Sequence, residues 1–139
     1  MADDDEDDRL LARDAFQDCA VDVDLRFVED GEELLEYLYG HGRWASAPAP
    51  ALIILDLNMP RKDGRECLVA IKENPALRRI PVVVLTTSKA EEDVLRSYDL
   101  GVSSFISKPV TYESLLLLVR TLCNYWFKTV RLPNHAPAK

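Results

Sequence analysis

Residues 51–60 read Ala-Leu-Ile-Ile-Leu-Asp-Leu-Asn-Met-Pro, and this stretch decides the fold. The apolar run at 51–55 is too short for a typical helix and has prolines on both sides, so it predicts a strand buried on both faces. Asp56 follows directly at the carboxyl end of that strand. Because open α/β sheets bind their ligands outside the carboxyl ends of their strands, Asp56 is the first candidate for a functional residue.

The sequence on both sides of this strand alternates between strand-like and helix-like hydrophobic patterns. Further strands are predicted at 24–28, 81–85 and 104–107, and amphipathic helices at 6–18, 32–39, 65–74, 90–100 and 111–127. Strands separated by helices of about ten residues form a parallel sheet with right-handed crossovers and helices on both faces. The chain is therefore predicted to adopt a doubly wound, flavodoxin-like α/β fold.

The first strand of this fold is conspicuously short, because only Met1 and Ala2 precede a cluster of acidic residues at 3–8. In a five-stranded sheet of order 2-1-3-4-5 the first strand lies in the middle, so two residues would leave backbone groups of its neighbours without partners. We expect either that the natural chain begins differently or that the first strand is truncated and the domain is weakened.

Length and charge restrict the class of protein. A chain of 139 residues is long enough for one domain with a hydrophobic core and short for two. The net charge of −7 arises at residues 3–8, which hold six acidic side chains, since the other 18 acidic residues are balanced by 17 basic ones. No basic stripe is present to neutralise phosphates, so we expect no nucleic acid as a partner.

Cysteine content and hydropathy indicate the cellular compartment of the protein. Cys19, Cys67 and Cys123 are widely spaced and lack nearby histidine ligands, so we expect three free, mostly buried thiols in a reducing environment. No apolar run approaches the roughly 18 residues of a membrane span, and no leader-like segment begins the sequence. We therefore expect a cytoplasmic protein that does not enter the membrane.

Polar side chains stand at the ends of four of the predicted strands: Asp3 and Asp4, Asp56, Thr86, and Lys108. In a parallel sheet these ends meet at one edge, so the side chains should converge. Carboxylates packed together need a cation, and a few carboxylate and carbonyl oxygens plus water suit Mg²⁺. Lys108 supplies a positive charge and Thr86 a hydroxyl donor for phosphoryl oxygens. The pattern indicates a site built to hold a phosphoryl group on Asp56.

Four segments in this order make the chain resemble the receiver domain of two-component response regulators. They are Asp3-Asp4, Leu55-Asp-Leu-Asn-Met-Pro60 with Asp63-Gly64, Val84-Leu-Thr-Thr-Ser88 and Phe105-Ile-Ser-Lys-Pro109. The resemblance covers residues 1–127 and leaves 128–139 as a C-terminal extension. It implies that Asp56 accepts a phosphoryl group from the phosphohistidine of a sensor histidine kinase. It also implies that Asp3 and Asp4 bind Mg²⁺ with Asp56, helped by the backbone carbonyl of Asn58.

The same resemblance assigns roles to three further residues. Lys108 would contact the phosphoryl group, Thr86 would donate a hydrogen bond to it, and Phe105 would switch between exposed and buried rotamers. When Thr86 moves toward the phosphoryl oxygens, Phe105 can turn inward, and the surface of the fourth helix, fifth strand and fifth helix changes. Members of the family usually hold the Lys-Pro bond in cis, so a cis bond is expected between Lys108 and Pro109.

The last predicted helix carries more apolar surface than packing on one side of a sheet requires, which suggests a partner surface. The segment 124–133 also runs past the usual end of a receiver domain. This segment, the long loop at 41–50 and the stretch Leu85-Thr-Thr-Ser88 most closely resemble single-domain response regulators paired with bacterial phytochrome kinases. This narrower resemblance implies a homodimer formed through the last helix and the extension, with output by protein contact.

Two other classes of protein share parts of this pattern. A Mg²⁺-dependent phosphatase with an aspartyl nucleophile carries an acid two residues after the nucleophile, and Asn58 at that position cannot transfer a proton. A flavin-binding protein of similar fold needs a phosphate loop after the first strand, where this chain has acidic residues. The leading hypothesis is a signalling switch that catalyses only its own phosphorylation and dephosphorylation, with the phosphatase as the alternative.

Overall fold

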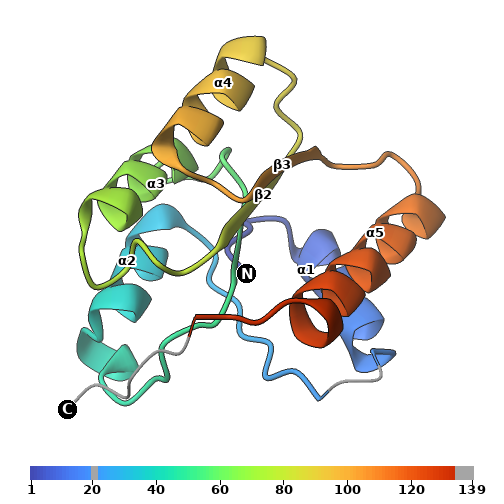
Figure 1. The fold of residues 1–139 in the computed structure, drawn as a ribbon, viewed down its shortest axis with the longest axis horizontal. Helices are drawn as coiled ribbons and strands as arrows, with labels where there is room; N and C mark the ends of the chain where they lie inside the picture. The colour runs from blue at the N-terminus through green and yellow to red at the C-terminus, as the bar shows by residue number, and fades with distance from the viewer. Residues whose placement is uncertain (20–21, 134–139) are drawn as a thin grey trace.

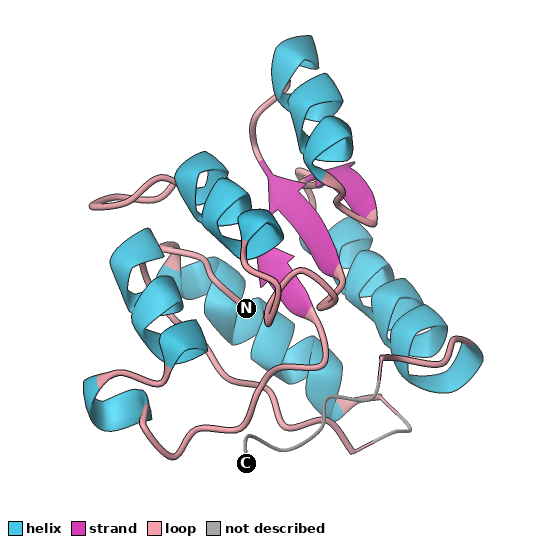
Figure 2. Cartoon of the chain, turned by 60° about the vertical axis from the view of Figure 1, so that its left-hand side comes forward, coloured by secondary structure: helices cyan, strands magenta, loops and turns pink. Residues whose placement is uncertain are grey.

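A three-stranded parallel sheet lies at the centre of the molecule, with helices on both faces (Figures 1 and 2). The computed structural model describes residues 1–19 and 22–133. The strands are β1 (Ile53–Leu55), β2 (Val82–Thr86) and β3 (Ser104–Ser107), in that order across the sheet. The helices are α1 (Glu6–Gln17), α2 (Gly31–Tyr39), α3 (Gly64–Glu73), α4 (Glu91–Leu100) and α5 (Tyr112–Asn124), with short turns η1 (Gly42–Trp44) and η2 (Tyr125–Thr129). Each of these strands and helices that the sequence predicts begins within two residues of its predicted start.

The first two predicted strands are reduced to single bridges, so the expected five-stranded sheet is corrected to three strands among the described residues. Ala2 forms isolated parallel bridges to Val28 on one side and to Leu55 on the other. Its amide donates to the carbonyl of Ile54 at 2.8 Å. These bridges place the N-terminal residues between the segment 24–28 and β1, which preserves the predicted order 2-1-3-4-5. Two residues are too few to form a ladder with either neighbour.

A pocket of about 320 Å³ lies where a longer first strand would run. Its walls come from the segments 22–28 and 48–54, with Met1 at one end. Along a parallel strand, every second residue directs its backbone amide toward the same neighbouring strand. The backbone amides of Arg26 and Ile54 therefore face this pocket. The pocket is therefore bordered on two sides by main-chain groups with which an extended segment can pair.

Adding about five apolar residues before Met1 is expected to raise the melting temperature by at least about 5 °C. The added strand would fill the pocket and pair with main-chain groups on both of its sides. Differential scanning calorimetry measures the shift, with a Gly-Ser extension of equal length as the control. Equal melting temperatures for the two extensions would contradict this account of the pocket.

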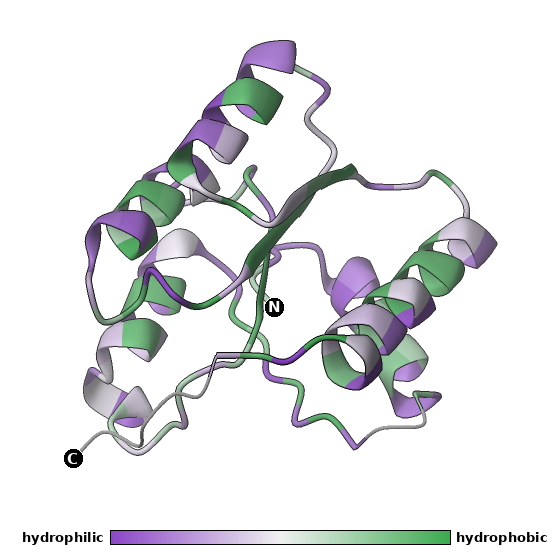
Figure 3. Cartoon of the chain, in the orientation of Figure 1, coloured by the Kyte–Doolittle hydropathy of each residue, from purple (hydrophilic) through white to green (hydrophobic). Residues whose placement is uncertain are grey.

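The sheet separates two hydrophobic clusters, and its strands are among the most apolar parts of the chain (Figure 3). α2 and α3 contribute to one cluster, and α1 and α5 to the other. Val82 and Val84 of β2 belong to the first cluster. Val83 and Leu85 belong to the second. A strand that packs against helices on both faces is apolar at every position, which explains why a continuous apolar run predicts it.

A disulfide between Cys19 and Cys123 joins the ends of α1 and α5, so the prediction of three free thiols is wrong for these two residues. Their Cα atoms lie 6.5 Å apart, within the range that a disulfide spans. Cys67 is free and buried, as predicted, and burial raises the pKa of its thiol to about 12. The paired cysteines are 104 residues apart in sequence, and only the packing of α1 against α5 brings them together.

α5 continues into η2, a turn of π-helix, and the end of the predicted extension, residues 134–139, lies outside the described residues. On α5, Leu115 and Val119 are buried, whereas Tyr112 and Leu117 remain 60% and 65% exposed. The last helix therefore does carry apolar surface beyond its packed face. None of the helices formed by residues 1–19 and 22–133 is both long and apolar enough to cross a membrane.

Candidate functional site

The predicted site residues converge at one edge of the sheet. Asp56 directly follows β1, Thr86 ends β2, and Lys108 directly follows β3. Asp3, Asp4 and Asp56 each place a carboxylate oxygen within 4.8 Å of the others. Asp3 and Asp56 are buried, whereas Asp4 is exposed. This convergence follows from the parallel arrangement, because the carboxyl ends of the strands share one edge.

Lys108 lies among these carboxylates and its side chain is only 8% exposed. Its ammonium nitrogen is 2.8 Å from Asp3 Oδ2 and 3.3 Å from Asp56 Oδ2. It also donates to Asp8 Oδ2, on the first turn of α1, at 2.8 Å. Burial lowers the pKa of Lys108, but the carboxylates of Asp3 and Asp8 outweigh burial and raise the pKa above its ordinary value. Lys108 therefore stays protonated and places a positive charge beside Asp56.

The surroundings of the Asp3 carboxylate show whether a cation fits this site. Burial raises the pKa of its carboxyl, and Lys108 offsets only part of this effect. Asp3 Oδ1 accepts a hydrogen bond from the amide of Asp5 at 2.9 Å. The buried Oδ2 contacts Lys108 at ion-pair distance but receives no well-directed hydrogen bond from any described residue. A buried oxygen with a free lone pair beside two further carboxylates fits a hard divalent cation.

Asn58 and Thr86 border the Asp56 carboxylate. The amide of Asn58 donates to Asp56 Oδ1 at 3.1 Å, which fixes the orientation of the carboxylate. Asn58 Nδ2 lies 3.5 Å from Thr86 Oγ1, which also accepts a hydrogen bond from the amide of Ser88 at 3.3 Å. Thr86 is thus at the site, with its hydroxyl engaged by its own loop. The role of the Asn58 backbone carbonyl as a metal ligand stays a prediction.

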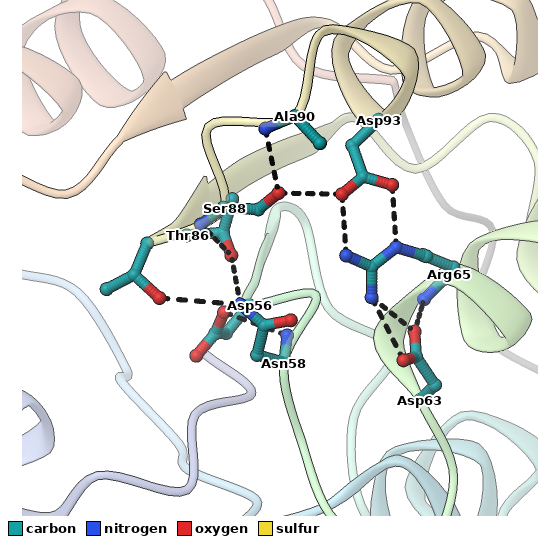
Figure 4. A network of polar contacts seen from close by, with 9 residues as sticks. Asp56, Asn58, Asp63, Arg65, Thr86, Ser88, Ala90 and Asp93 are labelled. Atoms are coloured by element: carbon teal, nitrogen blue, oxygen red, sulfur yellow. Dashed lines mark hydrogen bonds and ion pairs between the residues drawn. The ribbon is translucent and has the colours of Figure 1, made fainter.

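A polar network beside Asp56 links α3, α4 and the loop between β2 and α4 (Figure 4). Arg65 donates to both carboxylate oxygens of Asp93, at 2.7 Å and 2.6 Å. A third guanidinium nitrogen donates to Asp63 Oδ2 at 3.0 Å. The Ser88 hydroxyl donates to Asp93 Oδ2 at 2.6 Å. We call Arg65, Asp93 and Ser88 the Arg65 network.

The Arg65 network predicts a pH dependence of stability. Arg65 and then Ser88 lower the pKa of Asp93 from 3.8 to about 2. A carboxyl with a lowered folded-state pKa stabilises the fold above its unfolded pKa, and this contribution is lost as the pH falls toward the folded pKa. The difference in free energy of unfolding between wild type and Asp93→Asn should therefore be constant above about pH 5 and shrink toward about pH 2. Urea denaturation at a series of pH values measures this difference in free energy. A difference that does not shrink as the pH falls would contradict the lowered pKa of Asp93.

Phe105 lies on β3, three residues before Lys108, and Pro109 follows Lys108 directly. Phe105 is half-buried against the cluster on the α2 and α3 face, and its amide donates to the Tyr98 hydroxyl at 3.1 Å. Its role as a rotamer switch stays a prediction. The bond between Lys108 and Pro109 is trans, so the expected cis bond is wrong. Trans is the ordinary form of X–Pro bonds, by about 0.5–1 kcal/mol.

Asp8 and the Arg65 network are parts of this edge that sequence reasoning missed. Asp8 lies in the first turn of the helix that follows Asp3 and Asp4, so its closeness to them in the sequence could have placed it near the site. Arg65 and Asp93 are 28 residues apart on different helices, and no local pattern predicts their contact.

Known proteins are similar to this chain over nearly its whole length. The family described as "Response regulator receiver domain" matches residues 1–120. Response regulator Rcp1 of Synechocystis sp. is 41% identical over 133 residues, which cover 96% of this chain and 90% of that protein. A crystal structure of the Mn(2+)-bound form of Rcp1 has a TM-score of 0.93 at 41% identity, over 96% of both chains. A crystal structure of the phosphorylated cyanobacterial phytochrome response regulator RcpA has a TM-score of 0.92 at 42% identity, over 96% of this chain and 95% of that one.

These similarities extend well beyond the four segments on which the resemblance rests. The structural agreement confirms a doubly wound, flavodoxin-like fold with a parallel sheet. The matched residues 1–120 contain every candidate site residue from Asp3 to Lys108. This chain therefore belongs to the family of response regulator receiver domains.

Proposed function

We propose that this protein accepts a phosphoryl group on Asp56 from the phosphohistidine of a sensor histidine kinase. The observation that carries the proposal is the buried Asp56 carboxylate, with Lys108 Nζ at 3.3 Å and two further carboxylates within 4.8 Å. In the transfer, an Asp56 oxygen attacks phosphorus and an O–P bond forms while the P–N bond to the histidine breaks. The electron pair of the broken bond stays on the imidazole nitrogen.

The surrounding residues stabilise the charge that this transfer brings to the site. Lys108 can turn from Asp56 to a phosphoryl oxygen, and Thr86 can donate its hydroxyl proton to another, because its hydroxyl serves only as an acceptor for the backbone amide of Ser88. Asp3, Asp4 and Asp56 would hold a divalent cation, which we propose is Mg²⁺, and the cation would neutralise phosphoryl oxygens. The Mn(2+)-bound form of the similar protein Rcp1 supports a divalent cation.

The signal is proposed to leave through the surface formed by α4, β3 and α5. Large apolar side chains that remain exposed are frequent on these elements and the turn between β3 and α5: Leu95, Tyr98, Val110, Tyr112 and Leu117. Exposed apolar surface of this kind suits contact with a protein. We infer a homodimer formed through α5 and the segment 125–133. Similarity to a phytochrome response regulator supports a phytochrome as the sensor kinase.

Incubation with acetyl phosphate and Mg²⁺ tests this function against the phosphatase alternative. A response regulator takes up at most one phosphoryl group per chain, and EDTA should prevent the uptake by removing the cation. Sustained multiple turnover of small phosphate esters would support a phosphatase instead. Family membership and the absence of an acid at Asn58 disfavour that alternative.

A further inference from the structure

Lys108 is held from α1 as well as from the sheet. Its ammonium nitrogen donates to Asp8 Oδ2 at 2.8 Å and to Asp56 Oδ2 at 3.3 Å. Its contact with Asp3 Oδ2, also 2.8 Å long, is an ion pair without a well-directed hydrogen bond. Of the two hydrogen bonds that Lys108 donates to described residues, the shorter therefore goes to Asp8, which belongs to a helix and follows no strand.

The position of Asp8 is fixed by the start of α1. Asp8 lies in the first turn of the helix, and its amide donates to the capping carboxylate of Asp5 at 3.3 Å. Ala12, four residues later on the same face of the helix, is buried, and with Leu85 it lines a small cavity that Asp8 and Lys108 also border. The side chain of Asp8 is 25% exposed and that of Lys108 is 8% exposed, so water screens this pair only in part.

Asp8 stands apart from the proposed cation ligands. The carboxylate oxygens of Asp3, Asp4 and Asp56 lie within 4.8 Å of one another, and this group of described residues does not include Asp8. Lys108 pairs with three described carboxylates, and two of them, Asp3 and Asp56, would share their negative charge with a bound cation. Lys108 would then also face a like charge, which repels it. Asp8 is the partner whose charge remains available to Lys108 in that state.

We propose that Asp8 is a positioning residue that keeps the Lys108 ammonium group at the edge of the sheet when a divalent cation occupies the proposed site. This inference rests on the proposed function of Asp56. Lys108 ends in a point charge on a flexible four-carbon chain, so without a partner it can swing toward water. Held by Asp8, the ammonium group stays within reach of the oxygens of a phosphoryl group on Asp56, whose charge it neutralises.

Labelling by acetyl phosphate over a range of Mg²⁺ concentrations tests this role in Asp8→Ala. We expect the labelling rate at saturating Mg²⁺ to fall about tenfold, the effect of losing a charge-assisted hydrogen bond. The Mg²⁺ concentration that gives half of the maximal rate should change by less than about threefold, because Asp8 is not a ligand of the cation. Asp8→Glu keeps the charge and should be labelled faster than Asp8→Ala.

Asp7→Ala is the matched control. Asp7 is exposed in the same first turn of α1, so this variant loses the same charge from the same end of the helix dipole. Its labelling rate should equal that of wild type. Should Asp8→Ala fail to fold, Asp8→Asn keeps the shape of the side chain and replaces it, with an expected fall of at least about threefold.

The NMR signal of the Lys108 ammonium group reports its position without any phosphoryl transfer. Ammonium protons give a signal only where burial and hydrogen bonding slow their exchange with water, and Lys108→Arg identifies the signal of Lys108. In EDTA, Asp3 and Asp56 remain its partners, so wild type and Asp8→Ala should both show the signal. With Mg²⁺, wild type should keep the signal and Asp8→Ala should lose it. A general distortion of α1 would instead change the signal equally in EDTA and in Mg²⁺.

The outcomes separate this inference from the proposed function. If Asp8→Ala is labelled as fast as Asp7→Ala, or faster, the inference is overturned and the function of Asp56 stands. A rise of about tenfold or more in the half-saturating Mg²⁺ concentration also overturns it, since Asp8 would then be a ligand of the cation. A wild type that takes up no phosphoryl group overturns the proposed function. In that case the Lys108 signal still decides the role of Asp8, because a signal that persists in Asp8→Ala with Mg²⁺ contradicts it.

Discussion

Asp56→Asn is expected to be labelled by acetyl phosphate at least about 100-fold more slowly than the wild type. Asparagine has no anionic oxygen to attack phosphorus. Its side-chain oxygen can still accept the hydrogen bond that the amide of Asn58 donates at 3.1 Å, so the fold should be retained. The other carboxylates cannot substitute well, because Asp3 is buried against Lys108 at 2.8 Å.

Labelling of Asp56→Asn is measured with radioactive acetyl phosphate in the presence of Mg²⁺. Asp7→Asn is the matched control, since Asp7 is an exposed residue of the same acidic segment. This control should be labelled at the wild-type rate. If Asp56→Asn and Asp7→Asn were labelled equally fast, Asp56 would not be the phosphoacceptor.

Lys108→Met is expected to lower the free energy of unfolding by about 3 kcal/mol in the presence of EDTA. The side chains of Asp3 and Asp56 are 1% and 5% exposed, and Lys108 pairs with both. Removing its charge leaves two buried carboxylates that repel each other. Mg²⁺ should restore part of the lost stability, because a divalent cation between the carboxylates supplies positive charge.

Urea denaturation of Lys108→Met with EDTA and with Mg²⁺ measures both effects. Lys89→Met removes the same charge from an exposed position in the loop after β2, and it should change stability by less than about 0.5 kcal/mol. A Lys108→Met protein as stable as Lys89→Met in EDTA would show that Lys108 does not compensate the buried carboxylates.

The sequence predicts those parts of the fold that depend on local patterns. β2 is apolar at Val82, Val83, Val84 and Leu85 because it packs on both faces, and such a run predicts a buried strand. Asp56, Thr86 and Lys108 were predictable as neighbours because topology alone brings strand ends together. The helix α1 begins at Glu6 as predicted, and Asp5 of the acidic cluster caps it by accepting from the amides of Asp7 and Asp8.

The remaining features depend on contacts between distant segments, which no local pattern encodes. The segment 24–28 alternates like a strand, yet it forms a single bridge, between Val28 and Ala2, and a hydrogen bond from the Met1 amino group to the carbonyl of Arg26. The disulfide between Cys19 and Cys123 depends on how α1 packs against α5. The Arg65 network likewise depends on how α3 and α4 lie beside each other, so it became visible only in three dimensions.

Reductive trapping is the most direct test of the central claim that Asp56 carries the phosphoryl group. Borohydride reduces an aspartyl phosphate to homoserine, and peptide mass spectrometry then locates the modified position. After incubation with acetyl phosphate and Mg²⁺, this account predicts homoserine at position 56 and none at positions 3–8. Homoserine at position 3 or 4 with unmodified Asp56 would contradict it.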